Sequence, residues 1–211
     1  MPSPIDWYDS RAADLAPRYE AIDPERLHAW LADLLPRPGA RALDIGAGTG
    51  RDAGWLSARG LAVTAVEPSC GMREQALRHH PPGSVHWIDD SLPDLDQVHR
   101  LGLRADLVLL SAVWMHLAPE QRPRAFERLV GLLAPGGLLA MTLRSGPSPP
   151  ESGMHPVSAA QLAQLCAAHG ARIVRRCDTP DAQGRPDVTW VALAIRSGGP
   201  AHHPPSPSTV S

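Results

Sequence analysis

The stretch Leu43-Asp44-Ile45-Gly46-Ala47-Gly48-Thr49-Gly50 decides the fold of this chain. It begins inside an alternating apolar run over residues 41–45, which is short enough for a buried strand, and a helix-like run begins at residue 51. Between them, three glycines let backbone approach a ligand closely, while unpaired N–H groups of the helix N-terminus point at it. The G-x-G-x-G spacing differs from the G-x-G-x-x-G of dinucleotide-binding turns, which disfavours a nicotinamide dehydrogenase.

A second signal is Glu67, which ends the apolar run over residues 61–66. A carboxylate at the end of the second strand of a βαβ unit can accept hydrogen bonds from ribose hydroxyls. Its position, 17 residues after Gly50, leaves room for one short helix and one strand. A tight turn followed by an ordinary strand-end carboxylate is the alternative interpretation.

These features resemble the first two motifs of class I S-adenosylmethionine-dependent methyltransferases, with Glu67-Pro68 as the second. Later stretches match in order: residues 87–93 resemble the adenine-contacting turn, 105–117 the fourth strand and active-site segment, and 132–140 the turn into the fifth strand. The resemblance covers about residues 28–196. It implies S-adenosyl-L-methionine as cofactor and S-adenosyl-L-homocysteine as product, and it leaves the methyl acceptor open.

The remaining chain alternates predicted strands with predicted helices. Strands are expected at 41–45, 61–66, 85–88, 105–110, 137–143, 171–177 and 188–195, and helices at 51–59, 69–79, 94–101, 119–133 and 158–169. This alternation predicts an α/β, Rossmann-like, doubly wound and mostly parallel seven-stranded sheet. The connection over 179–186 is too short for a helix, so the last strand should be antiparallel, which is also the family's architecture.

Three segments are expected. Residues 1–38 form an N-terminal helical lid with helices at 6–19 and 24–35, residues 39–196 form the S-adenosylmethionine-binding domain, and residues 197–211 form a disordered tail rich in Pro, Ser and His. Tyr8, Arg11 and Tyr19 are candidates for a lid over the cofactor. Surface packing is the alternative role for all three.

Composition is that of an ordinary globular protein, with 43% hydrophobic and 20% charged residues. The net charge of −2 offers no electrostatic attraction for nucleic acid. Three cysteines without C-x-x-C spacing argue against a disulfide framework or a zinc site. Neither a signal peptide nor a stretch of membrane-spanning length is visible. We therefore expect a cytoplasmic monomer or homodimer with a small-molecule substrate and no membrane or nucleic-acid partner.

The resemblance implies roles for individual residues. Asp44 is expected near the amino-acid part of the cofactor, Glu67 at the ribose, and Asp89 at the adenine amino group with the backbone of Asp90 beside it. The full set of expected cofactor-binding residues is Asp44, Gly46, Ala47, Gly48, Gly50, Glu67, Pro68, Asp89, Asp90 and Ser111.

The pair Asp89-Asp90 also suggests a divalent metal, as in some catechol-type methyltransferases. The Asp-Asn partner that such a site needs after the fifth strand is replaced by Arg144-Ser145. We therefore expect no metal.

Methyl transfer from a sulfonium requires mainly that the nucleophile be held in line and water be kept away. A base is needed only when the acceptor still carries its proton. The candidate catalytic residues are His155, His116 and Arg144. His155 is favoured because a loop residue beside Gly153 can approach the substrate as the site closes, whereas His116 also has to pack behind Trp114. Arg144 could bind a substrate carboxylate through two hydrogen bonds.

The expected function is therefore methyl transfer from S-adenosylmethionine to a small molecule by in-line displacement. An RNA or protein methyltransferase is one alternative, although no basic groove or appended binding module is visible. A non-catalytic cofactor-binding regulatory protein is another, because binding motifs do not establish turnover.

Overall fold

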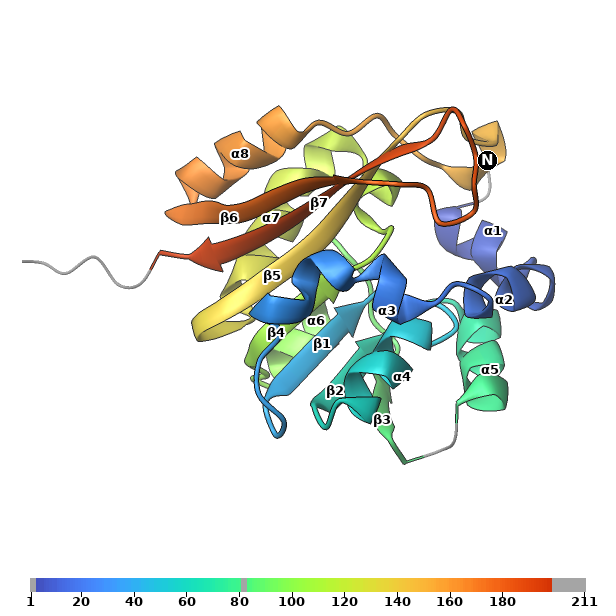
Figure 1. The fold of residues 1–211 in the computed structure, drawn as a ribbon, viewed down its shortest axis with the longest axis horizontal. Helices are drawn as coiled ribbons and strands as arrows, with labels where there is room; N and C mark the ends of the chain where they lie inside the picture. Colours follow the sequence, from blue (N-terminus) through green and yellow to red (C-terminus); the bar gives the residue numbers. More distant parts are fainter. Residues whose placement is uncertain (1–2, 81–82, 199–211) are drawn as a thin grey trace, which may run out of the picture.

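The computed structural model, which describes residues 3–80 and 83–198, contains a seven-stranded sheet with helices on both faces (Figure 1). The strand order is β3-β2-β1-β4-β5-β7-β6. The strands are β1 (Arg41–Ile45), β2 (Ala62–Val66), β3 (Val85–Ile88), β4 (Ala105–Leu110), β5 (Leu133–Ser145), β6 (Ala171–Thr179) and β7 (Thr189–Ser197).

Strand direction confirms the predicted architecture. The pairs among β3, β2, β1, β4 and β5 are all parallel, while β7 runs antiparallel to both β5 and β6. Strand β1 lies between β2 and β4, so the chain order reverses there. In open α/β sheets a ligand crevice forms beyond the carboxyl ends of the strands at such a reversal.

The helices after β1 fall where the sequence predicts them. They are α4 (Arg51–Ala58), α5 (Cys70–His79), α6 (Asp96–Arg100), α7 (Arg122–Gly131) and α8 (Ala159–Ala168). The helix expected from residue 119 starts as a short 3₁₀ turn, η3 (Pro119–Gln121). Strand β5 begins earlier than expected because Leu133 already pairs with Ala105 of β4.

Alternating side chains of the central strands fill two apolar layers. On one face Leu43 and Val108 belong to a core shared with α6, α7 and α8, through residues such as Phe126. On the other face Ala42 and Leu107 belong to a core with α4 and the N-terminal 3₁₀ helix η1 (Ala29–Leu34). Both faces of the sheet are thus covered, and its carboxyl edge remains available for a ligand.

The N-terminal segment is divided more finely than the two predicted helices. It forms α1 (Pro4–Asp9), α2 (Ala12–Glu20), α3 (Pro24–Leu27) and η1. A capping box between Ser3 and Asp6 starts α1, with Asp6 N donating to Ser3 Oγ at 3.2 Å and Ser3 N donating to Asp6 Oδ2 at 3.0 Å. Arg11, at φ −116°, interrupts the predicted helix over 6–19.

Helices α1 and α2 lie next to α5, at the edge toward which the arrowheads of β1 and β2 point (Figure 1). Most of the predicted tail, residues 199–211, lies outside the described residues. Within the described part of the chain, no helix has the length and apolarity needed to cross a bilayer.

Candidate functional site

A cavity of about 430 Å³ opens beyond the carboxyl ends of β1, β2 and β4. Its walls come from distant parts of the chain: the glycine turn after β1, the segment after β4, the end of β5, the N-terminal helices and the β6–β7 connection. Of the expected cofactor-binding residues, the cavity is lined by Asp44, Gly46, Ala47, Gly48, Glu67, Pro68, Asp90 and Ser111, and not by Gly50 or Asp89.

The glycine turn has a backbone that side chains would prevent. Gly46 and Gly48 have φ of 72° and 56°, in the left-handed region that favours glycine. A Cβ on Gly46 would lie 2.5 Å from Cγ2 of Val113 in the segment after β4. A Cβ on Gly48 would meet no described atom within 4 Å, because it would project into the cavity. The turn therefore presents bare backbone to a ligand.

Gly50 has a packing role. It lies directly before α4, and a Cβ there would stand 3.1 Å from the Trp87 ring and 3.2 Å from His80. The third glycine thus allows the start of α4 to approach β3 and the end of α5.

Two buried carboxylates face the cavity. Asp44 is 1% exposed, and its Oδ2 has no hydrogen-bond partner among the described residues. Burial, together with the nearby charge of Asp52, raises the pKa of Asp44 well above its usual range. Glu67 accepts hydrogen bonds from Gly48 N at 2.8 Å and Ser69 N at 2.9 Å, one on each oxygen. Each of its oxygens keeps a lone pair for a further donor.

The turn after β3 presents Asp90 to the cavity instead of Asp89. The Asp89 side chain is 63% exposed and pairs with Arg73 Nη2 at 2.9 Å. Asp90 accepts hydrogen bonds from Ser91 N and Val98 N at 2.9 and 3.0 Å, which fasten the turn to α6. The side chain that the sequence led us to expect at the adenine, Asp89, therefore does not line the cavity, whereas Asp90 does.

The two candidate histidines are placed differently. His116 lines the cavity, and its Nε2 lies 3.1 Å from the hydroxyl of Tyr8 in α1. Burial lowers the pKa of His116 to about 4. The ring of His155 does not line the cavity, and its amide donates to Met115 O at 2.7 Å. Of the two histidines, only His116 therefore lies at the cavity.

The residue after Ser111 carries backbone strain that the sequence did not reveal. Ala112 has φ 60° although it carries a Cβ, and its N–H donates to Thr142 Oγ1 of β5 at 2.8 Å. All three residues line the cavity. A non-glycine residue in this region costs about 1–3 kcal/mol and is concentrated at functional sites.

Arg144, at the end of β5, is 8% exposed and lines the cavity. Its two Nη atoms donate to the carbonyls of Gly146 and Pro147, and its buried Nε lacks a partner within the described part of the chain. Burial, followed by the charge of Arg185, lowers the pKa of Arg144.

The β6–β7 connection forms a wall of the cavity that the sequence did not predict. Asp181 accepts hydrogen bonds from Arg185 Nε at 3.0 Å, Arg185 Nη2 at 2.6 Å and Trp190 Nε1 at 2.9 Å. All three residues line the cavity. The spacing of Asp181 and Arg185 by four positions was the available signal, but that spacing is common in connections and does not say which way a loop turns.

The N-terminal helices close another side of the cavity through polar and apolar contacts. Asp9 Oδ1 accepts hydrogen bonds from Ser69 Oγ at 2.9 Å and Gly71 N at 2.7 Å, at the start of α5. Tyr8 and Tyr19 both line the cavity, and burial raises the pKa of each hydroxyl. Arg11 instead stacks over Trp7, 4.9 Å from the ring centre.

No set of three or more His, Cys, Asp or Glu side chains within residues 3–80 and 83–198 is arranged to hold a metal ion.

Comparison with known proteins agrees with the fold and the glycine turn. Residues 43–139, which run from β1 into β5, match a family model described as a methyltransferase domain. This part of the chain is therefore similar to methyltransferase domains. A relative, an uncharacterized methyltransferase of Bacillus licheniformis, is 34% identical over 107 residues, covering 51% of this chain and 48% of that protein. The chain thus spans about half the length of this curated relative.

Solved structures of methyltransferases share the fold. Magnesium protoporphyrin IX methyltransferase from Synechocystis PCC 6803, solved with bound S-adenosylmethionine, superimposes with a TM-score of 0.71 at 18% identity, covering 93% of this chain and 99% of that one. The 1,6-didemethyltoxoflavin N1-methyltransferase of Burkholderia thailandensis, solved with bound S-adenosylhomocysteine, gives a TM-score of 0.63 at 22% identity, covering 94% and 92%.

Proposed function

We propose that this protein transfers the methyl group of S-adenosylmethionine to a small-molecule acceptor by in-line displacement. The observation that carries the proposal is the combination, in one cavity, of a bare glycine turn with the unpartnered carboxylate oxygen of Asp44 and the carboxylate of Glu67. When bound, S-adenosylmethionine supplies a methyl group already activated by its cationic sulfur.

The residues of the cavity fit this cofactor. A cationic ammonium beside Oδ2 of Asp44 would favour the charged form of that buried carboxylate and satisfy its orphaned oxygen. Glu67 keeps acceptor capacity for ribose hydroxyls, and Gly48 lets them approach because it has no side chain in the cavity. Asp90 and Ser91, in place of the Asp89 side chain, form the wall for the adenine.

The chain's own contribution to chemistry is to position the acceptor, exclude water and hold its proton. Helices α1 and α2 and the β6–β7 connection line the cavity and would exclude water if they close over the bound substrates. His116 is neutral near neutral pH because its pKa is about 4. It shares a hydrogen bond with Tyr8, so this pair can hold the proton of an acceptor in a hydrogen bond, while the low pKa makes His116 a weak base.

A small acceptor is favoured over RNA or protein by the shape and charge of the site. The chain's own N-terminal helices form one wall of the cavity, and the net charge of the chain is −2. The two solved relatives described above act on small molecules according to their names. The cytoplasmic location and the monomeric or homodimeric state expected from the sequence remain predictions.

Calorimetry with S-adenosylhomocysteine tests the proposal. We expect micromolar affinity, about −8 kcal/mol, and no binding of NADH. Glu67→Gln should weaken the affinity by about 1.5–3 kcal/mol, or roughly tenfold to a hundredfold, because a charged acceptor is lost. Glu127→Gln, which changes a 59% exposed side chain on α7, is the matched control and should bind normally.

Binding of NADH without binding of S-adenosylhomocysteine would reject the proposal. If S-adenosylhomocysteine binds but no metabolite pool accepts a labelled methyl group from S-adenosylmethionine, the non-catalytic regulatory alternative is favoured.

A further inference from the structure

The charged side chains that line the cavity divide it into two ends. The acidic end is built from residues before position 91, and its carboxylates are Asp44, Asp52, Glu67 and Asp90. Arg51 also lies there, but its Nε and Nη2 pair with both oxygens of Asp52 at 2.8 and 3.0 Å. This end matches the cationic cofactor of the proposed function.

The opposite end is basic and is built from residues after position 140. Arg144 comes from the end of β5 and Arg185 from the β6–β7 connection, and Asp181 is the lining carboxylate that faces them. The nearby His116 adds no charge near neutral pH, since its pKa is about 4. Asp181 balances one arginine, so this end keeps one net positive charge.

Donors for an anion remain available on both arginines. A guanidinium has five N–H groups. In Arg144 the bonds to Gly146 O and Pro147 O leave one hydrogen on each Nη, while the Nε–H is buried without a partner among the described residues. In Arg185 the bonds to Asp181 involve Nε and Nη2, so both hydrogens of Nη1 remain. Arg144 is 8% exposed, and a buried cation with unsatisfied donors is costly unless a partner arrives. The Arg185 side chain is 41% exposed, so its free Nη1 is open to a ligand.

We propose that this basic end binds a carboxylate on the methyl acceptor, so that the substrates are small organic monocarboxylates. The inference rests on the proposed function and deepens it, since the acceptor would lie between this end and the cofactor. The single excess positive charge matches a carboxylate better than a phosphate dianion, and guanidinium groups match carboxylates geometrically. Asp181 is a positioning residue, because it holds both Arg185 and Trp190 in the wall.

The body of the acceptor would meet apolar and aromatic surface. Side chains of this kind in the lining of the cavity include Tyr8, Leu117, Met154 and Trp190. An acceptor with an apolar or aromatic body and one carboxylate would therefore satisfy both the walls and the charge.

The test uses the full chain saturated with S-adenosylhomocysteine and two probes of equal shape, 4-fluorobenzoate and the uncharged 4-fluorobenzamide. Fluorine NMR measures the binding of each probe up to about 5 mM, the range suited to weak fragments. We expect the benzoate to bind at least about tenfold more tightly than the benzamide. Equal behaviour of the two probes, including no binding of either, would overturn the inference.

Arginine variants test whether the basic end of the cavity causes the preference for 4-fluorobenzoate over 4-fluorobenzamide. Arg185→Gln should abolish the preference for the benzoate while the affinity for S-adenosylhomocysteine stays within about twofold. Arg144→Gln should do the same, but it changes a buried residue, so Arg185, whose side chain is 41% exposed, is the primary variant. An unchanged preference in Arg185→Gln would also overturn the inference.

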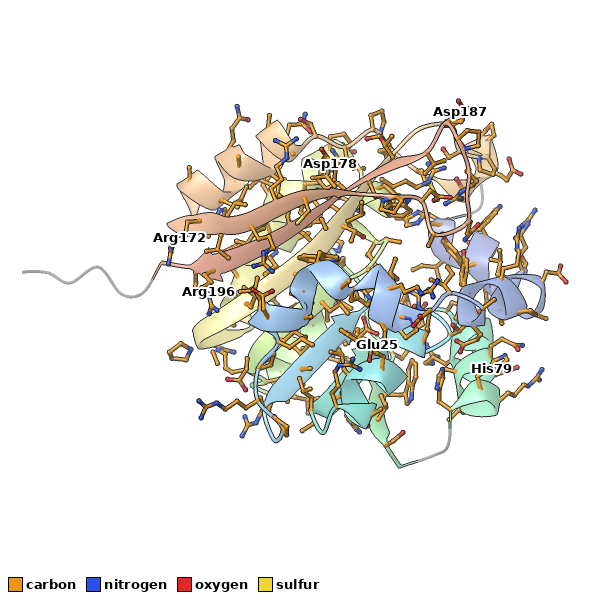
Figure 2. All side chains as sticks on the ribbon, viewed as in Figure 1. Glu25, His79, Arg172, Asp178, Asp187 and Arg196 are labelled. Carbon is orange, nitrogen blue, oxygen red and sulfur yellow. The ribbon has the colours of Figure 1, made fainter. Side chains whose placement is uncertain are left out.

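The matched control is Arg172→Gln. Arg172 is exposed at the start of β6 and does not line the cavity. Figure 2 shows it at the opposite end of the β6–β7 pair from Asp187, which lies in the connection. This variant should keep the wild-type preference. If the wild-type chain does not bind S-adenosylhomocysteine at all, the proposed function is rejected. Failure of the proposed function is therefore distinguishable from failure of the carboxylate inference.

Discussion

Three glycine-to-alanine substitutions distinguish three effects of an added methyl group: backbone strain, a steric clash, and intrusion into the cavity. Gly39, Gly46 and Gly48 all have positive φ, at 87°, 72° and 56°. A Cβ at Gly39, in the turn before β1, or at Gly48 would meet no described atom within 4 Å, whereas a Cβ at Gly46 would lie 2.5 Å from Val113 Cγ2. Gly39 is therefore the control for strain alone.

The expected magnitudes follow from these surroundings. Gly39→Ala should lower the free energy of unfolding by about 1–2 kcal/mol, the cost of a Cβ in the left-handed region. Gly46→Ala should cost about 2–5 kcal/mol, because displacement of Val113 adds an overpacking penalty. Gly48→Ala should lose the same 1–2 kcal/mol of stability as Gly39→Ala, and its methyl group should weaken the binding of S-adenosylhomocysteine at least about tenfold.

Urea denaturation measures the free energy of unfolding, and calorimetry independently measures the affinity for S-adenosylhomocysteine. Gly39→Ala and Gly48→Ala should be equally stable, and Gly46→Ala should be less stable than both. If Gly46→Ala is no less stable than Gly39→Ala, the contact with Val113 does not constrain the turn. If Gly48→Ala binds S-adenosylhomocysteine as tightly as the wild type, the turn is not the cofactor cradle.

Two further predictions concern the N-terminal helices and the buried histidine. Hydrogen exchange over residues 4–20 should slow when S-adenosylhomocysteine binds, because these helices line the cavity and would act as a lid; equal protection with and without ligand would make them fixed packing. The pKa of His116 in the folded protein, about 4, lies below its ordinary value of 6.5, so its contribution to stability is complete above pH 6.5 and is lost as the pH falls toward 4. Thermal denaturation should show a loss of up to about 3 kcal/mol across this window, and His116→Gln should lack that part of the pH dependence; an unchanged dependence would contradict the assignment.

The sequence by itself determined the order and type of the central elements. Apolar alternation and turn residues act over a few positions, so β3 and β4 have the bounds predicted from the pattern. The short connection before β7 was enough to predict its antiparallel direction. The glycine turn and Glu67 were found for the same reason, because a local backbone requirement and a strand end determine where they lie.

Only the tertiary structure decided which side chains face the cavity. Asp89 and Asp90 are adjacent in the sequence, yet only the second lines it. His116 gained its environment from Tyr8, which is 108 positions away, and no local pattern encodes that contact. The basic end likewise depends on where the β6–β7 connection turns, which brings Arg185 to Arg144. The physical reason is that local propensity sets backbone conformation, whereas the direction of a loop and the burial of a charge depend on packing between distant segments.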